Sequence, residues 1–80
     1  MFHVYILQSL KDNNLYIGMT SGLEGRIKRH NAGYERATKS RAPFKLIHSE
    51  SFLTRAESRK KEKRFKSGFG REIIKKLLIH

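Results

Sequence analysis

The chain has 80 residues, with 18 lysines and arginines against 7 acidic residues, for a net charge of +11. It has no cysteine, which excludes disulfides, thiolate nucleophiles and cysteine-ligated zinc, and no apolar run near the roughly 20 residues of a membrane-spanning helix. The length predicts one domain over residues 1–80, which we expect to be a soluble, cytoplasmic monomer. The charge predicts a polyanionic partner, with nucleic acid ahead of any membrane surface.

Two apolar runs near the N-terminus predict a β-hairpin. Residues 2–9, FHVYILQS, are β-branched and aromatic, and residues 15–19, LYIGM, form the second run. The Asp and Asn residues of 11–14 favour a turn between them. With a four-residue turn, Leu10 pairs with Leu15. Alternation along the strands then places four side chains on one face, Tyr5, Leu7, Ser9 and Tyr16.

A helix is predicted over residues 22–31, GLEGRIKRHN. Thr20 or Ser21 can cap its N-terminus through a side-chain hydroxyl. Gly33 suits the left-handed conformation that commonly ends a helix. The polar, basic residues 34–43 then predict a loop.

The C-terminal half predicts a third strand over residues 44–52 and a second helix from the capping box Thr54–Glu57 to about Lys66. A third, short amphipathic helix is predicted from the spacing of four apolar residues, Ile73, Ile74, Leu77 and Leu78. The expected class is α+β. A three-stranded antiparallel sheet is flanked by helices in the order β-β-α-β-α-α.

Two residues of the first helix are candidates for phosphate chemistry. Arg26 and His30 lie four residues apart, so their side chains project from one side of the helix. A solvated basic pair on a basic helix has the same spacing. A phosphate site would differ from a solvated pair only in having other functional groups close to Arg26 and His30.

Glu62 stands out in the second helix, which has seven basic residues and two acids over residues 55–66. Glu57 is explained by the capping box, whereas Glu62 lies three residues before Phe65 and should lean toward the core. It can be a surface ion-pair partner for Arg59 or Lys66, worth about 0.3–0.5 kcal/mol. The alternative is a ligand for a hard cation such as Mg²⁺.

The two hairpin tyrosines have a structural interpretation and a chemical one. Tyr5 and Tyr16 fit amphipathic strands, and an unperturbed phenol with a pKa near 10 is a poor base at neutral pH. A nearby arginine, an imidazole and a divalent cation could together lower that pKa in a partly dry pocket.

Taken in order, these residues resemble the GIY-YIG nuclease superfamily, and most closely its small stand-alone bacterial members of the UPF0213 type. The resemblance covers nearly the whole chain. It is carried by VYIL at 4–7, LYIG at 15–18, the Arg26-x-x-x-His30 pair, and the late Glu62 followed by KSG at 66–68. The chain departs from the family pattern at His3, where the first motif has glycine, and has no asparagine after Asn31.

The resemblance implies a metal-dependent DNA endonuclease acting in repair or processing, on substrates such as branched or damaged DNA. In the family, the tyrosine at Tyr5 activates water or binds near the scissile phosphate, and the one at Tyr16 supports it. Arg26 would stabilise charge on the phosphate, His30 would orient groups or shuttle a proton, and Glu62 would hold one Mg²⁺ or Mn²⁺.

Two other functions stay open. One is a non-catalytic basic module of the same fold that binds nucleic acid through phosphate contacts. The other is an accessory protein for RNA. Six basic residues are candidates for nucleic-acid contact, Arg26, Arg29, Lys39, Arg41, Lys45 and Lys66.

Overall fold

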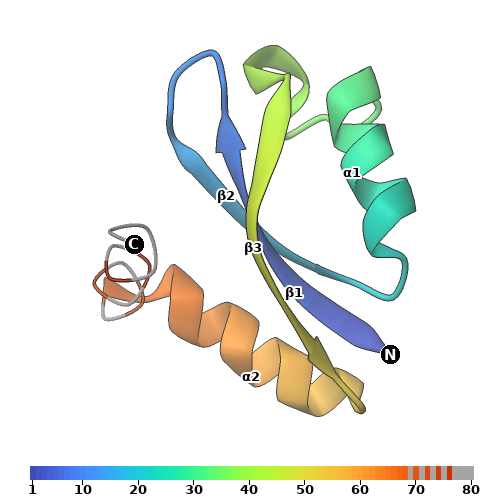
Figure 1. The fold of residues 1–80 in the computed structure, drawn as a ribbon, viewed down its shortest axis with the longest axis vertical. Helices are drawn as coiled ribbons and strands as arrows, with labels where there is room; N and C mark the ends of the chain where they lie inside the picture. The colour runs from blue at the N-terminus through green and yellow to red at the C-terminus, as the bar shows by residue number, and fades with distance from the viewer. Residues whose placement is uncertain (69, 71, 73, 75, 77–80) are drawn as a thin grey trace.

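The computed structural model of the protein describes residues 1–68, 70, 72, 74 and 76. Its regular elements follow the predicted order, β1 (Phe2–Ser9), β2 (Leu15–Thr20), α1 (Leu23–Ala32), the short 3₁₀ helix η1 (Lys39–Arg41), β3 (Phe44–Phe52) and α2 (Arg55–Lys66). The three strands form one antiparallel sheet in the order β2-β1-β3, with the N-terminal strand in the centre (Figure 1). The α+β class is therefore confirmed.

The predicted third helix remains a prediction. Three of the four residues that defined it, Ile73, Leu77 and Leu78, lie outside the described residues. Within the described part of the chain, no helix is long and apolar enough to cross a membrane.

The hairpin register differs from the predicted one by two residues. Leu15 pairs with Gln8, not with Leu10. Six residues, 9–14, therefore lie between the last paired residues of the hairpin, rather than the four that were predicted. The Ser9 and Asn14 backbones bond across it at 2.9 Å, and Asn13 takes a left-handed φ of 62°. A shift of two residues keeps the alternation of side chains. The predicted sharing of one face by Tyr5 and Tyr16 is therefore correct.

The two faces of the sheet are covered by different helices (Figure 1). On one face, buried Val4, Ile6 and Phe65 join β1 to α2. On the other face, Tyr5, Leu7 and Phe44 pack with partly buried residues of α1, Leu23 and Ile27. Because β1 is buried on both faces, neighbouring residues of this strand belong to opposite sides of the fold.

The N-terminus of α1 differs from the prediction. The N-cap is Gly22, with no side-chain hydrogen bond, so neither Thr20 nor Ser21 caps the helix. The Thr20 side chain belongs to the end of β2, where its hydroxyl accepts a bond from the Gly22 N–H at 3.1 Å. The C-terminus is as predicted, because Gly33 adopts a left-handed φ of 79°.

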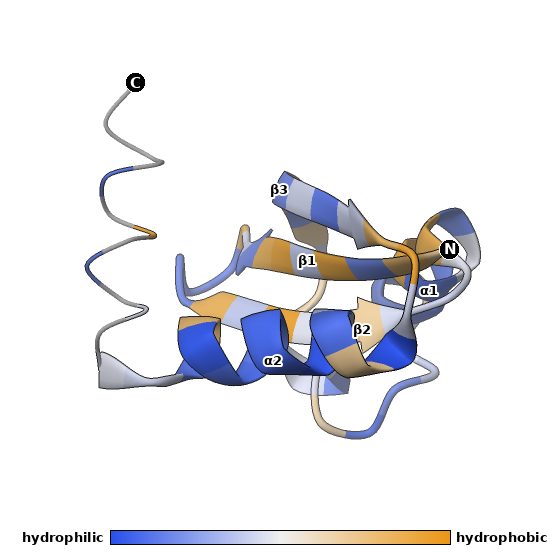
Figure 2. Cartoon of the chain, turned by 90° about the horizontal axis from the view of Figure 1, so that it is seen from below, coloured by the Kyte–Doolittle hydropathy of each residue, from blue (hydrophilic) through white to orange (hydrophobic). Residues whose placement is uncertain are grey.

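Helix α2 is held to the sheet by very few apolar contacts. Thr54 caps it as predicted, accepting a bond from the Glu57 N–H at 3.2 Å. Figure 2 shows a largely hydrophilic helix lying against the sheet. Phe65, which is fully buried, is its only large apolar side chain. The position of α2 therefore depends strongly on this one residue.

Candidate active site

Tyr5 lies at the centre of the α1 face of the sheet. It pairs with Gly18 of β2, and its ring lies directly over that glycine, where any Cβ would overlap it. This close approach explains why the LYIG stretch ends in glycine. The Tyr5 side chain is only 1% exposed, so its hydroxyl needs a partner within the protein.

That partner is His30, at the end of α1. The Tyr5 hydroxyl lies 3.1 Å from Nε2 of the ring, and the other ring nitrogen, Nδ1, lies 2.7 Å from Oγ1 of Thr38. The Thr38 hydroxyl donates in turn to the Glu35 carbonyl at 3.5 Å, so it accepts from Nδ1. This order leaves Nε2 unprotonated. His30 is thus placed to accept the proton of Tyr5.

Burial sets the protonation state of both groups. Desolvation lowers the pKa of His30, and the positive charges of Arg26 and Arg29 lower it further, against the opposing charge of Glu35. Desolvation likewise raises the pKa of Tyr5 far above its ordinary value of 10.0. At neutral pH the pair is therefore a neutral imidazole and a neutral phenol, joined by a hydrogen bond from the Tyr5 hydroxyl to Nε2.

We expect the stability of the protein to fall as the pH drops below 6.5, the ordinary pKa of histidine. Below that pH, the histidine of the unfolded chain binds a proton, whereas His30 of the folded protein does not. The free energy of unfolding therefore decreases. The lowered pKa values of Glu35 and Asp12 act at lower pH, below 4.5 and 3.8. Urea unfolding near pH 7.5 and near pH 5.5, with an NMR titration of the His30 ring, measures the effect. A ring that titrates above 6.5 would contradict the buried, neutral imidazole.

Tyr16 completes an aromatic cluster around His30. Its ring meets the imidazole edge-on, with centroids 5.0 Å apart, and lies 6.4 Å from the ring of Tyr5. Unlike Tyr5, it is partly exposed. The structure therefore brings both predicted tyrosines together with His30, and Tyr16 is the one that reaches the surface.

Arg26 lies one helical turn before His30, as predicted, and its charge acts to lower the pKa of Tyr5. Its guanidinium is 3.5 Å from the Glu35 carboxylate, which also accepts a bond from Arg29 at 3.0 Å. The Arg29 guanidinium holds the pKa of Glu35 below its usual range. The Glu35 carboxylate thus lies between the two arginines that flank the tyrosine cluster.

Glu62 is the predicted site residue that lies apart. It belongs to α2, which packs on the opposite face of the sheet from the tyrosines. Its carboxylate accepts a bond from Lys66 at 3.1 Å, the surface ion pair that the sequence left open. Burial is the main cause of the raised pKa of Tyr5, and the charge of Glu62 adds to it. Among the causes of that shift, the charge of Glu62 is the smallest.

A divalent ion at Glu62 would have a single protein carboxylate as ligand, the one that accepts a bond from Lys66. Among the residues that the structure describes, no three His, Cys, Asp or Glu side chains converge. Mg²⁺ suits such a sparse site, because it commonly takes one or two carboxylates and completes its shell with water and substrate phosphate oxygens. Glu62, with a side chain 19% exposed, meets this requirement.

His3, where the family pattern has glycine, fits the sheet without displacing Tyr5. It lies on the same face as Tyr5, two residues before it, between Thr20 and Ser51 on the flanking strands. Its Nδ1 is 3.0 Å from the Ser51 hydroxyl. The substitution therefore adds a polar side chain beside the cluster.

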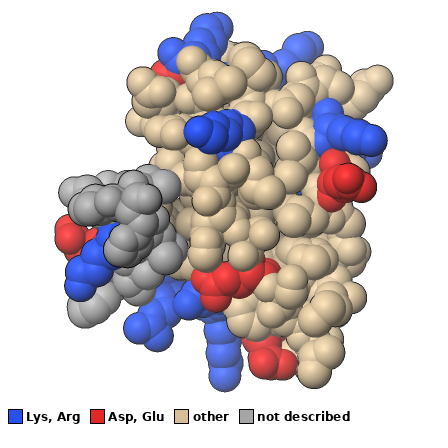
Figure 3. All heavy atoms as spheres, viewed as in Figure 1, with Lys and Arg blue, Asp and Glu red and all other residues tan. Residues whose placement is uncertain are grey.

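The six basic residues expected to contact nucleic acid differ in whether they form ion pairs within the protein. Arg26 and Arg29 share Glu35, Lys66 pairs with Glu62, and Arg41 pairs with Asp12 at 3.2 Å. Lys39 and Lys45 are exposed and make no ion pair with any described residue. On the face in Figure 3, basic side chains gather toward the upper and lower ends.

Sequence comparisons relate the chain to one family of proteins. The GIY-YIG catalytic domain matches residues 1–76. A UPF0213 protein of Staphylococcus haemolyticus is 39% identical over 77 residues, which cover 95% of this chain and 92% of the relative. A UPF0213 protein of Bacillus velezensis is 42% identical over 65 residues, covering 80% of this chain and 66% of the relative.

A solved structure is similar over almost the whole chain. The solution NMR structure of a UPF0213 protein from Bacillus halodurans is 33% identical and matches with a TM-score of 0.58. The match covers 98% of this chain and 86% of that one.

Proposed function

Because the chain belongs to the GIY-YIG catalytic-domain family, we propose that it is a metal-dependent endonuclease that hydrolyses phosphodiester bonds in DNA. The observation that carries the proposal is the hydrogen-bonded chain from Tyr5 through His30 to Thr38, with Arg26 one turn away on the same helix. Hydrolysis of a phosphodiester needs a base for water and a cation for the phosphate. This cluster offers both.

In this proposal, Arg26 binds the scissile phosphate. The phosphate takes the place of the Glu35 carboxylate, because both are anions with oxygens that match the guanidinium. The Tyr5 hydroxyl is buried in the substrate-free protein, so this proposal requires a local opening of the cluster that admits the attacking water.

Proton transfer follows the hydrogen bonds. Tyr5 accepts a proton from water as it passes its own to Nε2 of His30, and Thr38 keeps Nδ1 in place. This relay avoids a buried phenolate, which the raised pKa of Tyr5 makes costly, but it places a positive charge on His30, whose lowered pKa opposes that charge. The negative charge of a bound phosphate beside the ring would offset this cost. Tyr16 restricts the ring of His30 from the exposed side.

Glu62 would hold Mg²⁺ or Mn²⁺, which would supply positive charge for the phosphate and the leaving oxygen. Because Glu62 belongs to α2, this role requires that the bound strand reach from Arg26 to the α2 side of the sheet. A cation there would also cancel the charge of Glu62, which raises the pKa of Tyr5. The metal requirement and the tyrosine chemistry would thus be linked through one carboxylate.

We expect Glu62→Ala to abolish cleavage while leaving DNA binding intact or slightly tighter, because a negative charge is lost. The measurement is nicking of supercoiled, branched and single-stranded DNA with Mg²⁺ or Mn²⁺, beside binding in EDTA. Glu24→Ala, an exposed carboxylate of α1, is the matched control and should cut normally. Cutting by Glu62→Ala at the wild-type rate would remove the metal site from the proposal.

A non-catalytic nucleic-acid-binding module is the second candidate, and two observations favour it. The Tyr5 hydroxyl is buried, and Glu62 is already paired with Lys66. This function predicts salt-sensitive binding with no cutting under any metal condition.

A further inference from the structure

We propose that a second surface of this protein, separate from the tyrosine cluster, binds single-stranded nucleic acid. It is an open pocket of about 370 Å³ between the end of β3 and α2, here called the α2–β3 pocket. Its lining is one aromatic ring, three cations and one carboxylate, Phe52, Lys60, Lys61, Arg64 and Glu57. This volume lies near the lower end of the range of small-ligand sites, about 300–1,000 Å³.

The α2–β3 pocket lies on the opposite side of α2 from Glu62. Ser58 and Phe65 mark the buried row of the helix, and Lys61 and Glu62 flank this row. Lys61 reaches Glu50 of β3 at 3.6 Å. Lys61 therefore faces β3, and Lys60 and Arg64 extend the same side of the helix toward solvent, whereas Glu62 is not part of the lining.

The positive charge of the pocket is only partly neutralised by the protein. Lys60 and Arg64 are exposed and pair with none of the described acidic residues. They lie one helical turn apart, about 6 Å along the axis. Glu57 opposes them, but its carboxylate accepts a bond from the Thr54 hydroxyl at 2.9 Å. Two unpaired cations in one row suit successive phosphates of a strand.

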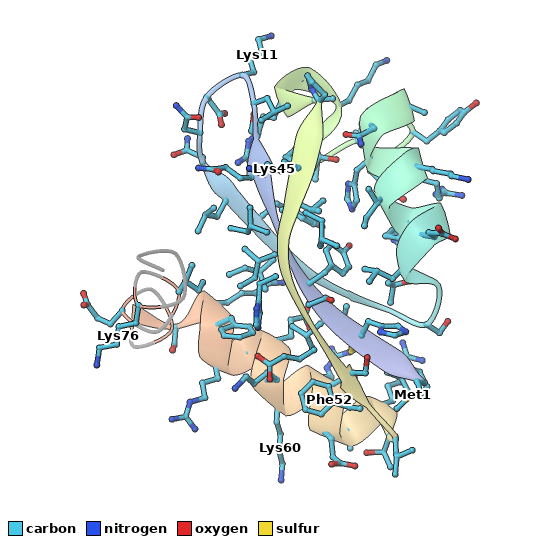
Figure 4. The ribbon with its side chains drawn as sticks, viewed as in Figure 1. Met1, Lys11, Lys45, Phe52, Lys60 and Lys76 are labelled. Atoms are coloured by element: carbon cyan, nitrogen blue, oxygen red, sulfur yellow. The ribbon has the colours of Figure 1, made fainter. Side chains whose placement is uncertain are left out.

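Phe52 indicates which kind of nucleic acid the α2–β3 pocket would bind. Its ring packs partly against the core and also lines the pocket, so one part of it stays accessible. Figure 4 shows Phe52 at the α2 end of the molecule, where Lys60 points away from the sheet. An aromatic platform beside cations binds unstacked bases, which single strands offer and a duplex does not.

Charge reversal tests the pocket. We expect Lys60→Glu combined with Arg64→Glu to weaken binding of a labelled ten-nucleotide oligo-dT by about tenfold or more, and to reduce the salt slope of log K by about 1.4. The control is Lys11→Glu with Lys28→Glu, which changes the net charge equally; Lys11 lies at the opposite end of the molecule (Figure 4). An equal loss in both double variants would overturn the proposal, since only total charge would then matter.

Two single variants test the charge and the aromatic ring of the pocket: one should tighten binding and the other should weaken it. Glu57→Gln keeps a capping side chain but removes the negative charge, so it should tighten binding about twofold or more. Phe52→Leu keeps an apolar side chain but removes the ring, so it should weaken oligo-dT and oligo-U binding alike and leave duplex binding unchanged. Loss of duplex binding to the same extent would show a phosphate site without base stacking, which contradicts the single-strand assignment.

All of these measurements are made by fluorescence anisotropy in EDTA, so no cleavage is required. If the protein never cuts DNA, the proposed function fails while these binding results stand. If the Lys60→Glu/Arg64→Glu variant binds like wild type and the wild type still cuts, the α2–β3 pocket alone is refuted.

Discussion

Replacing Tyr5 by phenylalanine should lower the rate of DNA cleavage by about 10²–10⁴-fold, the usual contribution of a general base. The ring still fills the space over Gly18, so the sheet should keep its shape. The loss of one hydroxyl leaves Nε2 of buried His30 without its donor, at a cost of about 1–3 kcal/mol. Nicking rates beside urea unfolding separate the catalytic effect from the structural one.

Tyr34→Phe is the control for this experiment. Tyr34 carries the same phenol but is 75% exposed, away from the core. Its variant should cut and unfold like the wild type. If Tyr5→Phe also cuts at the wild-type rate, the relay through His30 is not the route of the proton.

Replacing Phe65 by alanine should remove a large part of the stability of the protein. Truncating a buried phenylalanine costs about 3–5 kcal/mol, against a total stability of about 4–12 kcal/mol for a chain of this length. Phe65 is fully buried and is the only large apolar side chain by which α2 packs on the sheet. Circular dichroism should show Tm lower by more than about 10 °C. Glu62, which depends on the same helix, should lose its position with it.

Leu53→Ala is the matched control, because Leu53 is apolar but 79% exposed. Its variant should change the free energy of unfolding by less than about 0.5 kcal/mol. A Phe65→Ala protein as stable as Leu53→Ala would mean that α2 is not anchored by the buried ring.

Local chemistry made much of the fold predictable. The capping box at Thr54 and the left-handed Gly33 place the ends of their helices as expected, because each feature acts over only a few residues. The hairpin register could not be predicted, because it depends on how Ser9 and Asn14 close the turn. The shared face of Tyr5 and Tyr16 was still correct, since the shift was an even number of residues.

The candidate site was predictable only where helical and strand periodicity applies. The i, i+4 spacing of Arg26 and His30 puts both on one side of α1, beside Tyr5. Thr38 and Glu35 could not be predicted as partners, because they lie in a loop whose path has no period. Glu35 had one signal, as the only acidic residue in an otherwise basic loop over 34–43.

The most direct test is the nicking of supercoiled plasmid by the wild-type protein as Mg²⁺ is added and then removed with EDTA. The account predicts cutting that rises with Mg²⁺, stops in EDTA and resumes when excess Mg²⁺ is restored. Binding without cutting at every Mg²⁺ and Mn²⁺ concentration would contradict a nuclease, and would leave a basic nucleic-acid-binding protein on the same fold.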